Sequence, residues 1–384
     1  MQNRSNRSPL LASILQVGGL AALLSGCAVQ PVSDESAVGE AQSAESSNDC
    51  GEDHGVPVIF DTDMDFDDSA ALAYLAAEHK MGHIDLRAVT VTNNGAGFPG
   101  EAIQHARCLL AQFGLSNIPV ADNTATGPKQ FPIELRGAAS VVLGQTLAGC
   151  TESAASSSVH AEKLLLDTVR NSHDPVTIVT TGPTTNLAAA LALSGSQGSQ
   201  ARQRFVDNVD RVFIMGGAVH VAGNVTPTDT EDGSQEYNIW GDQAAATTIF
   251  QTFDDVYLVA LDATQHVPVT VAFSNRIAGD HHTPEADYVY SLTSNPLIAG
   301  AVQANLGFYW WDPLDAVASS TSSVVTYETD QIAITTSGLQ NGRTAIVSRH
   351  QGSRIKVGVN ANAAAFENVF IDTLNHRASN QGHH

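Results

Sequence analysis

The chain has 384 residues, of which 43% are hydrophobic and 15% are charged, and its formal net charge is −22. This length and apolar content are sufficient for a large buried core. An acidic surface repels phosphate backbones, which argues against nucleic acid as a partner, whereas a neutral small molecule or a cation is compatible with it.

Residues 1–26 have the pattern of an export signal. Arg4 and Arg7 precede the apolar run PLLASILQVGGLAALL, which is too short to span a bilayer as a helix. The motif LSGC, which ends at Cys27, resembles the lipobox of bacterial lipoproteins, in which the cysteine is lipidated and becomes the new N-terminus. We therefore expect an exported protein of the cell envelope, anchored to the membrane by acyl chains on Cys27. An ordinary secretory signal with an incidental cysteine is the alternative.

Residues 27–55 contain no Lys or Arg and are rich in Ser, Ala and acids. Their apolar content is too low for folding, so they predict a flexible acidic tether. Cys50, Cys108 and Cys150 remain after Cys27, and an oxidising compartment would allow one disulfide with one thiol left over. The sequence does not decide the pairing, and Cys108, in the helical pattern HARCLLAQF, is also compatible with a buried thiol.

From residue 56 onward, short β-branched apolar runs alternate with helical patterns. The predicted strands are 56–60, 86–92, 118–121, 176–181, 209–215 and 255–261, and the predicted helices are 69–80, 100–114, 160–171, 184–193 and 241–251. This alternation predicts one α/β domain over residues 56–376, with a mainly parallel central sheet flanked by helices.

Several boundaries carry specific signals. We expect Asp68 or Ser69 to cap the first helix and Gly114 to end the second. Residues 330–338 and 342–349 flank LQN and predict a C-terminal β-hairpin, followed by a strand at 354–360 and a helix at 363–376. Residues 151–159 predict a mobile loop, and residues 377–384 a disordered tail.

The stretch DTDMDFDD, residues 61–68, follows the first predicted strand and contains five aspartates. Carboxylates this close repel one another unless a cation or bound protons compensate them, so the turn is either a solvated acidic loop or a metal site. In open α/β sheets, ligands bind beyond the carboxyl ends of the strands. The residues expected there supply mainly oxygen and amide donors, which suit Ca²⁺ or Mg²⁺ better than zinc. They include Thr92, Asn93, Asn94, Thr180, Thr181 and the segment MGGAVHVAGN at 215–224.

Two known acidic motifs fit poorly. An EF-hand loop that begins at Asp61 needs Gly at its sixth position and Glu at its twelfth, and these positions are Phe66 and Leu72. A phosphatase of the haloacid-dehalogenase type has Asp-x-Asp-Gly followed by Thr or Val, where this chain has Met64 and Asp65. That function is the weakest alternative.

A third resemblance covers most of the chain. The motifs DTDMDFDD (61–68), TGPTTNLA (181–188), MGGAVHVAGN (215–224) and EYNIWGD (236–242) resemble, in order, those of the inosine-uridine-preferring nucleoside hydrolases. In the first motif, Met64 and Asp65 replace the family's Pro-Gly. The resemblance runs from about Val56 to His376 and implies the nucleoside hydrolase fold.

The resemblance also implies roles for individual residues. Asp63, Asp68, the Thr181 carbonyl and Asp312 would bind Ca²⁺, and Asp63 would be the general base that activates a calcium-bound water. The residues implied to bind a small-molecule nucleoside are Asp67, Asn94, Met215, Asn224, Glu236 and Asn238. Asp65, at a glycine position of the family, is expected to face solvent or to lie just behind the metal ligands.

The expected reaction is hydrolysis of the N-glycosidic bond of ribonucleosides to ribose and free base. Its transition state resembles an oxocarbenium ion, which nearby carboxylates and amides stabilise. A non-catalytic nucleoside- or sugar-binding lipoprotein that retains the metal site is the alternative. A homo-oligomer is compatible with the sequence.

The residue before Asp312 departs from one branch of the family, where a histidine protonates the departing base. Here it is Trp311, whose indole does not titrate and is therefore expected to stack on the base. Tyr309 and Trp310 would extend this aromatic wall, with one of the two buried in the core. His281 and His282 are expected on a surface loop, with a place at the mouth of the pocket as the alternative.

Overall fold

The computed structural model describes residues 55–122 and 127–378. The expected signal peptide, the lipidation site at Cys27 and nearly all of the expected tether lie outside the described residues. Among the described helices, none combines the length and the apolar character needed to cross a membrane.

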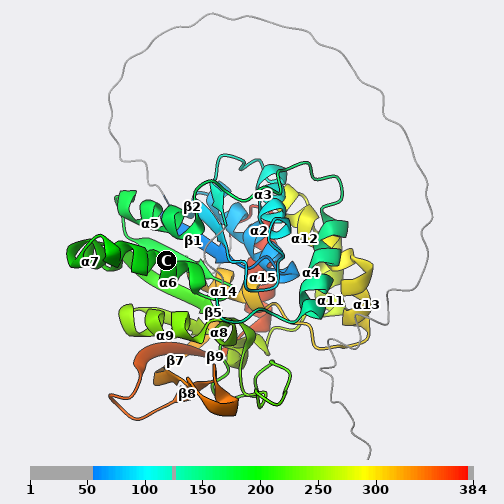
Figure 1. The fold of residues 1–384 in the computed structure, drawn as a ribbon. Helices are drawn as coiled ribbons and strands as arrows, with labels where there is room; N and C mark the ends of the chain where they lie inside the picture. Colours follow the sequence, from blue (N-terminus) through cyan, green and yellow to red (C-terminus); the bar gives the residue numbers. More distant parts are fainter. Residues whose placement is uncertain (1–54, 123–126, 379–384) are drawn as a thin grey trace, which may run out of the picture.

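The described strands form one nine-stranded sheet in the order β3-β2-β1-β4-β5-β6-β9-β7-β8. They are β1 (Val56–Thr62), β2 (Ile84–Val91), β3 (Val120–Ala121), β4 (Val176–Thr180), β5 (Val209–Met215), β6 (Val256–Val259), β7 (Val325–Ile334), β8 (Thr344–Ile346) and β9 (Ser353–Ala361). All pairs from β3 to β9 are parallel, and β7 is antiparallel to β9 and to β8. The predicted parallel sheet with a C-terminal hairpin is confirmed (Figure 1).

Helices cover both faces of the sheet (Figure 1). They are α2 (Phe66–Lys80), α3 (Glu101–Gln112), α4 (Ile133–Thr146), α5 (Ala161–Asn171), α6 (Thr185–Ser196), α7 (Ser199–Asp207), α8 (Tyr237–Gly241), α9 (Gln243–Thr252), α10 (Leu261–Thr264), α11 (Val271–Gly279), α12 (Pro284–Ser294), α13 (Pro296–Gln303), α14 (Trp311–Ser320) and α15 (Ala363–Leu374). A short 3₁₀ helix, Gly338–Gln340, lies in the hairpin loop.

The pleat of the central strand divides the core in two. Val58 and Phe60 belong to a hydrophobic cluster with residues of α2, α12, α14 and α15. Ile59 belongs to a second cluster with residues of α5, α6 and α9. Successive side chains of a strand point to opposite faces, so a strand buried on both sides reads as the continuous apolar run seen at residues 56–60.

The helix boundaries show one error and one success of the sequence signals. Asp65, rather than Asp68 or Ser69, caps α2, with its side chain accepting from the Phe66 N–H at 2.6 Å. Asp68 instead accepts the backbone N–H of Asp65 at 2.8 Å, which completes a capping box. Gly114 ends the next helix with φ 73°, as predicted.

Cys108 of α3 and Cys150 form a disulfide, so Cys108 is not a free buried thiol. The loop that follows Cys150 has no helix or strand, as expected, but it is bound to its surroundings. Gln104 donates to the Glu152 carbonyl at 2.7 Å, and Asp122 accepts from the Ser157 N–H at 2.8 Å. The expected mobile loop is therefore held on both sides.

The described part of the chain includes the first residues of the expected tail. Arg377, the first residue of the expected tail, is described and donates to Asp280 at 2.6 Å and to Asp372 at 3.1 Å. Residues 379–384 lie outside the described part.

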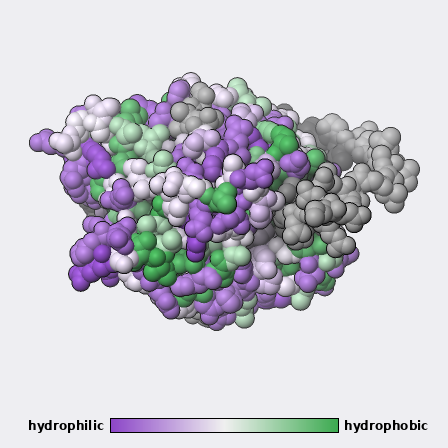
Figure 2. All heavy atoms as spheres, turned by 60° about the horizontal axis from the view of Figure 1, so that its bottom comes forward, coloured by the Kyte–Doolittle hydropathy of each residue, from purple (hydrophilic) through white to green (hydrophobic). Residues whose placement is uncertain are grey.

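The surface is mixed in polarity. Figure 2 shows one face on which hydrophilic side chains surround smaller hydrophobic patches. The exposed large apolar side chains include Ile133 and Val141 of α4. Other residues of α4 line a cavity at the edge of the sheet.

Candidate functional site

The turn between β1 and α2 carries the acidic stretch and has an unusual backbone. Met64 is fully buried and has φ 57°, in the left-handed region that non-glycine residues rarely adopt. Its N–H donates to the Thr62 hydroxyl at 2.9 Å, which helps hold this conformation. The turn brings Asp63 and Asp67, on either side of it, to the same cavity.

Asp61 faces the interior and does not line the cavity. Its carboxylate accepts from the Thr90 hydroxyl and from the Asn186 amide, both at 2.7 Å. Burial raises the pKa of Asp61 to about 7. This contact gives the Asn of TGPTTNLA a structural role, because Asn186 joins α6 to the end of β1.

Three carboxylates converge beside this turn. Asp67, Asp68 and Asp312 are buried, and they offer oxygen atoms that lie within 4.8 Å of one another. Burial raises the pKa of Asp67 and of Asp312 well above the ordinary value, and neighbouring aspartates raise both further. A buried set of oxygen donors with uncompensated like charge fits a hard divalent cation such as Ca²⁺. The site is therefore a possible acidic metal site.

Asp63 lies next to this group and is 2% exposed. Its Oδ2 is buried and has no hydrogen-bond partner among the described residues, which leaves it available as a ligand or a proton acceptor. Burial and then the charge of Asp68 raise the pKa of Asp63 well above the ordinary value. A Cβ at Gly95 would come within 1.8 Å of this oxygen, and one at Gly182 within 2.8 Å of the Asp63 Cβ. Only glycine leaves room for Asp63 at these two positions.

Asp65 is partly buried and lines the cavity while capping α2. Burial raises its pKa to about 7. Its position next to the carboxylate group, without being one of the three that converge, agrees with the expectation for this residue.

Thr181, the remaining predicted metal ligand, contacts Asp68. The hydroxyls of Thr62 and Thr181 donate to Asp68. The Thr181 carbonyl accepts from the Asn238 amide at 2.8 Å. A carbonyl oxygen has two lone pairs, so this hydrogen bond leaves one for a cation.

The cavity at this edge of the sheet has a volume of about 240 Å³. A single bound water needs roughly 10–15 Å³ of such space, so the cavity accommodates a small organic molecule. Of the residues predicted to bind metal or substrate, Asn94 alone does not line it. Asn94 is fully buried, its Oδ1 accepts from Thr92 at 2.5 Å, and its amide nitrogen has no partner within the described residues.

The polar wall of the cavity comes from the segment after β5. Glu236 is 2% exposed and caps α8, accepting from the N–H groups of Gly217, Asn238 and Ile239. Asn224, at the exposed rim, accepts from the Tyr237 N–H at 3.1 Å. These contacts hold both side chains at the cavity before any ligand binds.

Aromatic side chains form another part of the lining. Trp311 begins α14, and its ring centroid is 5.6 Å from that of Tyr309; both line the cavity. Trp310 is buried in the core, where its ring packs edge-on against Phe273. The expectation that one of Tyr309 and Trp310 belongs to the core is therefore confirmed.

No histidine is among the described residues that line the cavity. His281 pairs with Asp287 at 2.6 Å, and the His282 ring lies 3.5 Å from Asp280. These contacts place both histidines on the loop before α12, which confirms the surface-loop prediction.

Several lining residues lacked any sequence signal. Helices α4 and α13, which the sequence did not predict, contribute Leu135, Ala138, Ala139, Val142, Leu297 and Ile298. Phe131 and Tyr237 also line the cavity, with ring centroids 5.0 Å apart. A run such as RGAASVVLGQ shows no clear helical periodicity, because α4 has apolar residues on two faces and contains two glycines.

These features can be compared with known proteins. A family model described as inosine-uridine preferring nucleoside hydrolase matches residues 58–368. The chain belongs to this family. The matched region contains the acidic turn, every predicted ligand of the metal site and both walls of the cavity.

Two curated relatives illustrate the range of similarity. The pyrimidine-specific ribonucleoside hydrolase RihA of Shewanella oneidensis is 31% identical over 217 residues, which cover 56% of this chain and 61% of the relative. The chain thus spans less than two thirds of that relative's length. A probable uridine nucleosidase 2 of Arabidopsis thaliana is 27% identical over 341 residues, or 83% of this chain and 97% of the relative.

Solved structures confirm the fold. The inosine-uridine preferring nucleoside hydrolase of Bacillus anthracis has a TM-score of 0.69 at 22% identity, over 84% of this chain and 99% of that one. A plant nucleoside hydrolase has the same TM-score at 24% identity, over 83% of this chain and 99% of that one. The predicted nucleoside hydrolase fold is therefore correct.

Proposed function

We propose that this protein hydrolyses the N-glycosidic bond of ribonucleosides and so takes part in nucleoside catabolism. The observation that carries the proposal is a set of buried carboxylates that line the same cavity as several aromatic side chains. The names of relatives include pyrimidine-specific and purine-preferring hydrolases, so the proposal covers ribonucleosides as a class.

Asp63, Asp67, Asp68 and Asp312 supply a donor set that suits calcium, with the Thr181 carbonyl as a further oxygen. When bound, the cation would compensate the clustered charges and lower the pKa of a water molecule. Because its Oδ2 has no other partner in the described part of the chain, Asp63 is the group that accepts the proton from the attacking water.

The other lining residues hold the substrate. Glu236, Asn224 and Asn238 present fixed oxygen and amide groups to the ribose hydroxyls. The carboxylates stabilise the positive charge that develops on the sugar as the base departs. Trp311 stacks on the base, and no histidine is among the described residues that line the cavity.

The proposal is tested by incubating the purified protein with inosine, uridine, adenosine and cytidine and measuring released reducing sugar. We expect release that EDTA abolishes and added Ca²⁺ restores. Asp68→Ala should lose calcium binding and the calcium-induced rise in melting temperature, whereas Asp254→Ala, at an exposed position, should keep both. Ligand binding without sugar release would instead favour the non-catalytic binding protein, and zinc in place of calcium would contradict the metal assignment.

We further propose that the protein is exported and lipid-anchored at Cys27 in the cell envelope. The disulfide between Cys108 and Cys150 supports an oxidising compartment. Metabolic labelling with a radioactive fatty acid should mark the expressed protein and not its Cys27→Ser variant. Equal labelling of both would refute the anchor.

A further inference from the structure

Within the described residues, two helices line the cavity with carbon side chains alone. We call this part of the lining the apolar chamber and define it by Leu135, Ala138, Ala139 and Val142 of α4 with Leu297 and Ile298 of α13. The four residues of α4 have the spacing i, i+3, i+4 and i+7, so they share one face of the helix. None of the six side chains has a hydrogen-bonding group.

The chamber continues the aromatic wall. The loop that follows α13 supplies Phe308 and Tyr309, which line the same cavity. The ring of Phe308 lies 5.2 Å from that of Phe66 and 6.4 Å from that of Trp311, between centroids. The part of a ligand that stacks on Trp311 is therefore the part that borders the chamber.

The chamber is a poor place for a sugar. Ribose hydroxyls or the polar edge of an unmodified base would lose their water there and gain no partner, which is unfavourable. The polar side chains that line the cavity are outside the chamber: the aspartates, Thr181, Asn224, Glu236, Tyr237, Asn238, Gln265 and Tyr309. A carbon-rich group on the base is the occupant that this chemistry favours.

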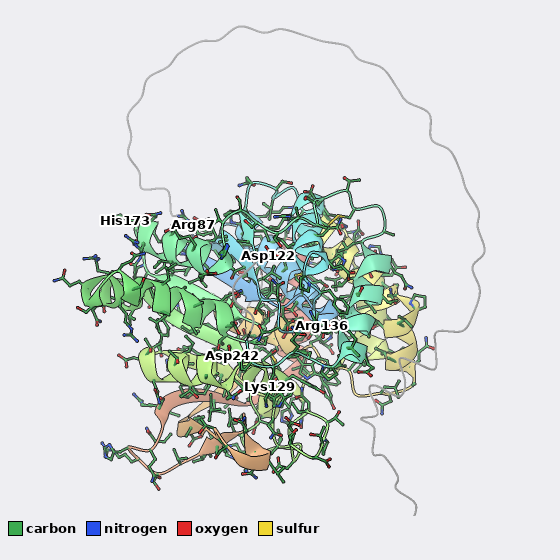
Figure 3. All side chains as sticks on the ribbon, viewed as in Figure 1. Arg87, Asp122, Lys129, Arg136, His173 and Asp242 are labelled. Atoms are coloured by element: carbon green, nitrogen blue, oxygen red, sulfur yellow. A yellow bond between two sulfur atoms is a disulfide. The ribbon has the colours of Figure 1, made fainter. Side chains whose placement is uncertain are left out.

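Helix α4 is held in place without a ligand. Arg136 of α4 is 5% exposed and points inward (Figure 3), and its guanidinium donates to the Gly97 carbonyl at 2.7 Å. The Gly97 N–H in turn donates to the Asp63 carbonyl at 2.8 Å. Beyond the far end of the helix, the disulfide joins Cys150 to α3. The chamber is thus preformed, so filling it requires no reordering of the helix.

We propose that the apolar chamber binds an apolar substituent on the nucleobase, and that this protein prefers base-modified nucleosides that carry such a group. The inference rests on the proposed hydrolysis of ribonucleosides and specifies the substrate class. The substituent fills the space between α4 and α13 while the ring stacks on Trp311 and the ribose meets the carboxylates.

The test compares kcat/KM for N6-benzyladenosine with that for adenosine, using wild type and two variants of one helix. Wild type should prefer the benzyl compound about tenfold or more, the discrimination typical of an apolar pocket. Val142→Trp fills the chamber and should bring the ratio of the two kcat/KM values close to one. Val141→Trp, on the outer face where Val141 is 47% exposed, should leave the ratio unchanged.

Ala138→Leu, a smaller change at the chamber, replaces Val142→Trp if melting curves show that the latter does not fold. Equal kcat/KM for both nucleosides in wild type, with no effect of either chamber variant, would overturn the inference and leave the proposed function intact.

Cleavage of neither nucleoside would contradict the proposed function. In that case the chamber is tested by ligand binding: N6-benzyladenosine should raise the melting temperature of wild type but not that of the chamber variant. A preference for a 5′-alkylthio nucleoside that Val142→Trp removes would place the chamber at the sugar and overturn the inference.

Discussion

The two ends of the cavity are built on different principles. The acidic end, formed by Asp63, Asp67, Asp68 and Asp312, comes from a strand end, the first turn of α2 and the first turn of α14. Threonine hydroxyls and backbone N–H groups contact these carboxylates. The apolar end comes from faces of α4 and α13 and offers shape alone.

This difference separates chemistry from selection. Carboxylates must be placed with small tolerance to share a cation and a reacting water, so short and hydrogen-bonded turns hold them. Apolar side chains only need to match the volume and polarity of the group that they bind, so helices suffice. Changes at the acidic end should therefore alter turnover, and changes at the apolar and aromatic end should alter KM.

The largest effect is expected at Asp63. Asp63→Asn keeps the shape of the side chain but cannot take a proton from water, so kcat should fall by about 10²- to 10⁴-fold with the melting temperature nearly unchanged. Steady-state kinetics on the best substrate measure this, with Asp254→Asn as an exposed control. A rate near that of wild type would remove Asp63 from the reaction.

The disulfide tests whether the apolar end depends on its anchor. Cys108 and Cys150 are 42 residues apart, and a cross-link of this span contributes roughly 3–4 kcal/mol in the chain-entropy account. Cys108→Ser with Cys150→Ser should lower the free energy of unfolding by about that amount in urea titrations. Cys50→Ser, which leaves the disulfide in place, should not. In the folded double variant, KM should rise more than kcat falls; the reverse would tie α4 to the chemistry.

Trp311 joins the two ends, because it precedes Asp312 and borders Phe308. Trp311→Ala removes a stacking surface worth about 1–3 kcal/mol, so KM should rise by roughly five- to 150-fold, most for purine nucleosides. Trp311→Phe should retain much of the activity. Kinetics of both variants on inosine and uridine decide this. Equal and severe losses of kcat with unchanged KM would show that the indole N–H acts in the transition state.

A separate effect, on stability rather than on turnover, concerns the acidic end without metal. Burial raises the pKa of Asp61 and of Asp65 to about 7 in the folded state, against about 4 in an unfolded chain. Between these values the unfolded chain binds fewer protons, so the stability that protonation provides is lost as the pH rises from about 4 to about 7. The melting temperature of EDTA-treated protein should fall over this range by a few degrees. Asp61→Asn should weaken the dependence; a melting temperature that rises with pH would contradict it.

The sequence by itself determined which predicted strand each polar segment follows, and it identified the acidic stretch at residues 61–68. Alternating apolar runs and helical patterns were sufficient for the parallel sheet and its hairpin, because burial on both faces makes strands continuously apolar. The aspartates of residues 61–68 could be recognised as a candidate metal site because clustered carboxylates need a compensating charge, whereas Asp312 was implied only by the family resemblance. The start of α2 was predicted less accurately. The predicted caps were Asp68 and Ser69, but Asp65 caps the helix, and Asp68 completes the capping box as its N3 residue.

Only the tertiary structure showed that α4 and α13 line the same cavity as the aspartates. Helices α4 and α13 carry no motif. Their cavity-lining side chains are apolar, like those of helices that pack against the core, and only the empty space beside them makes them part of the cavity. Packing also decided that Asn94 is buried away from the cavity lining and that Cys108 pairs with Cys150. An apolar side chain looks the same in sequence whether it fills a core or lines a chamber, because the distinction depends on the distance to its neighbours and not on its own chemistry.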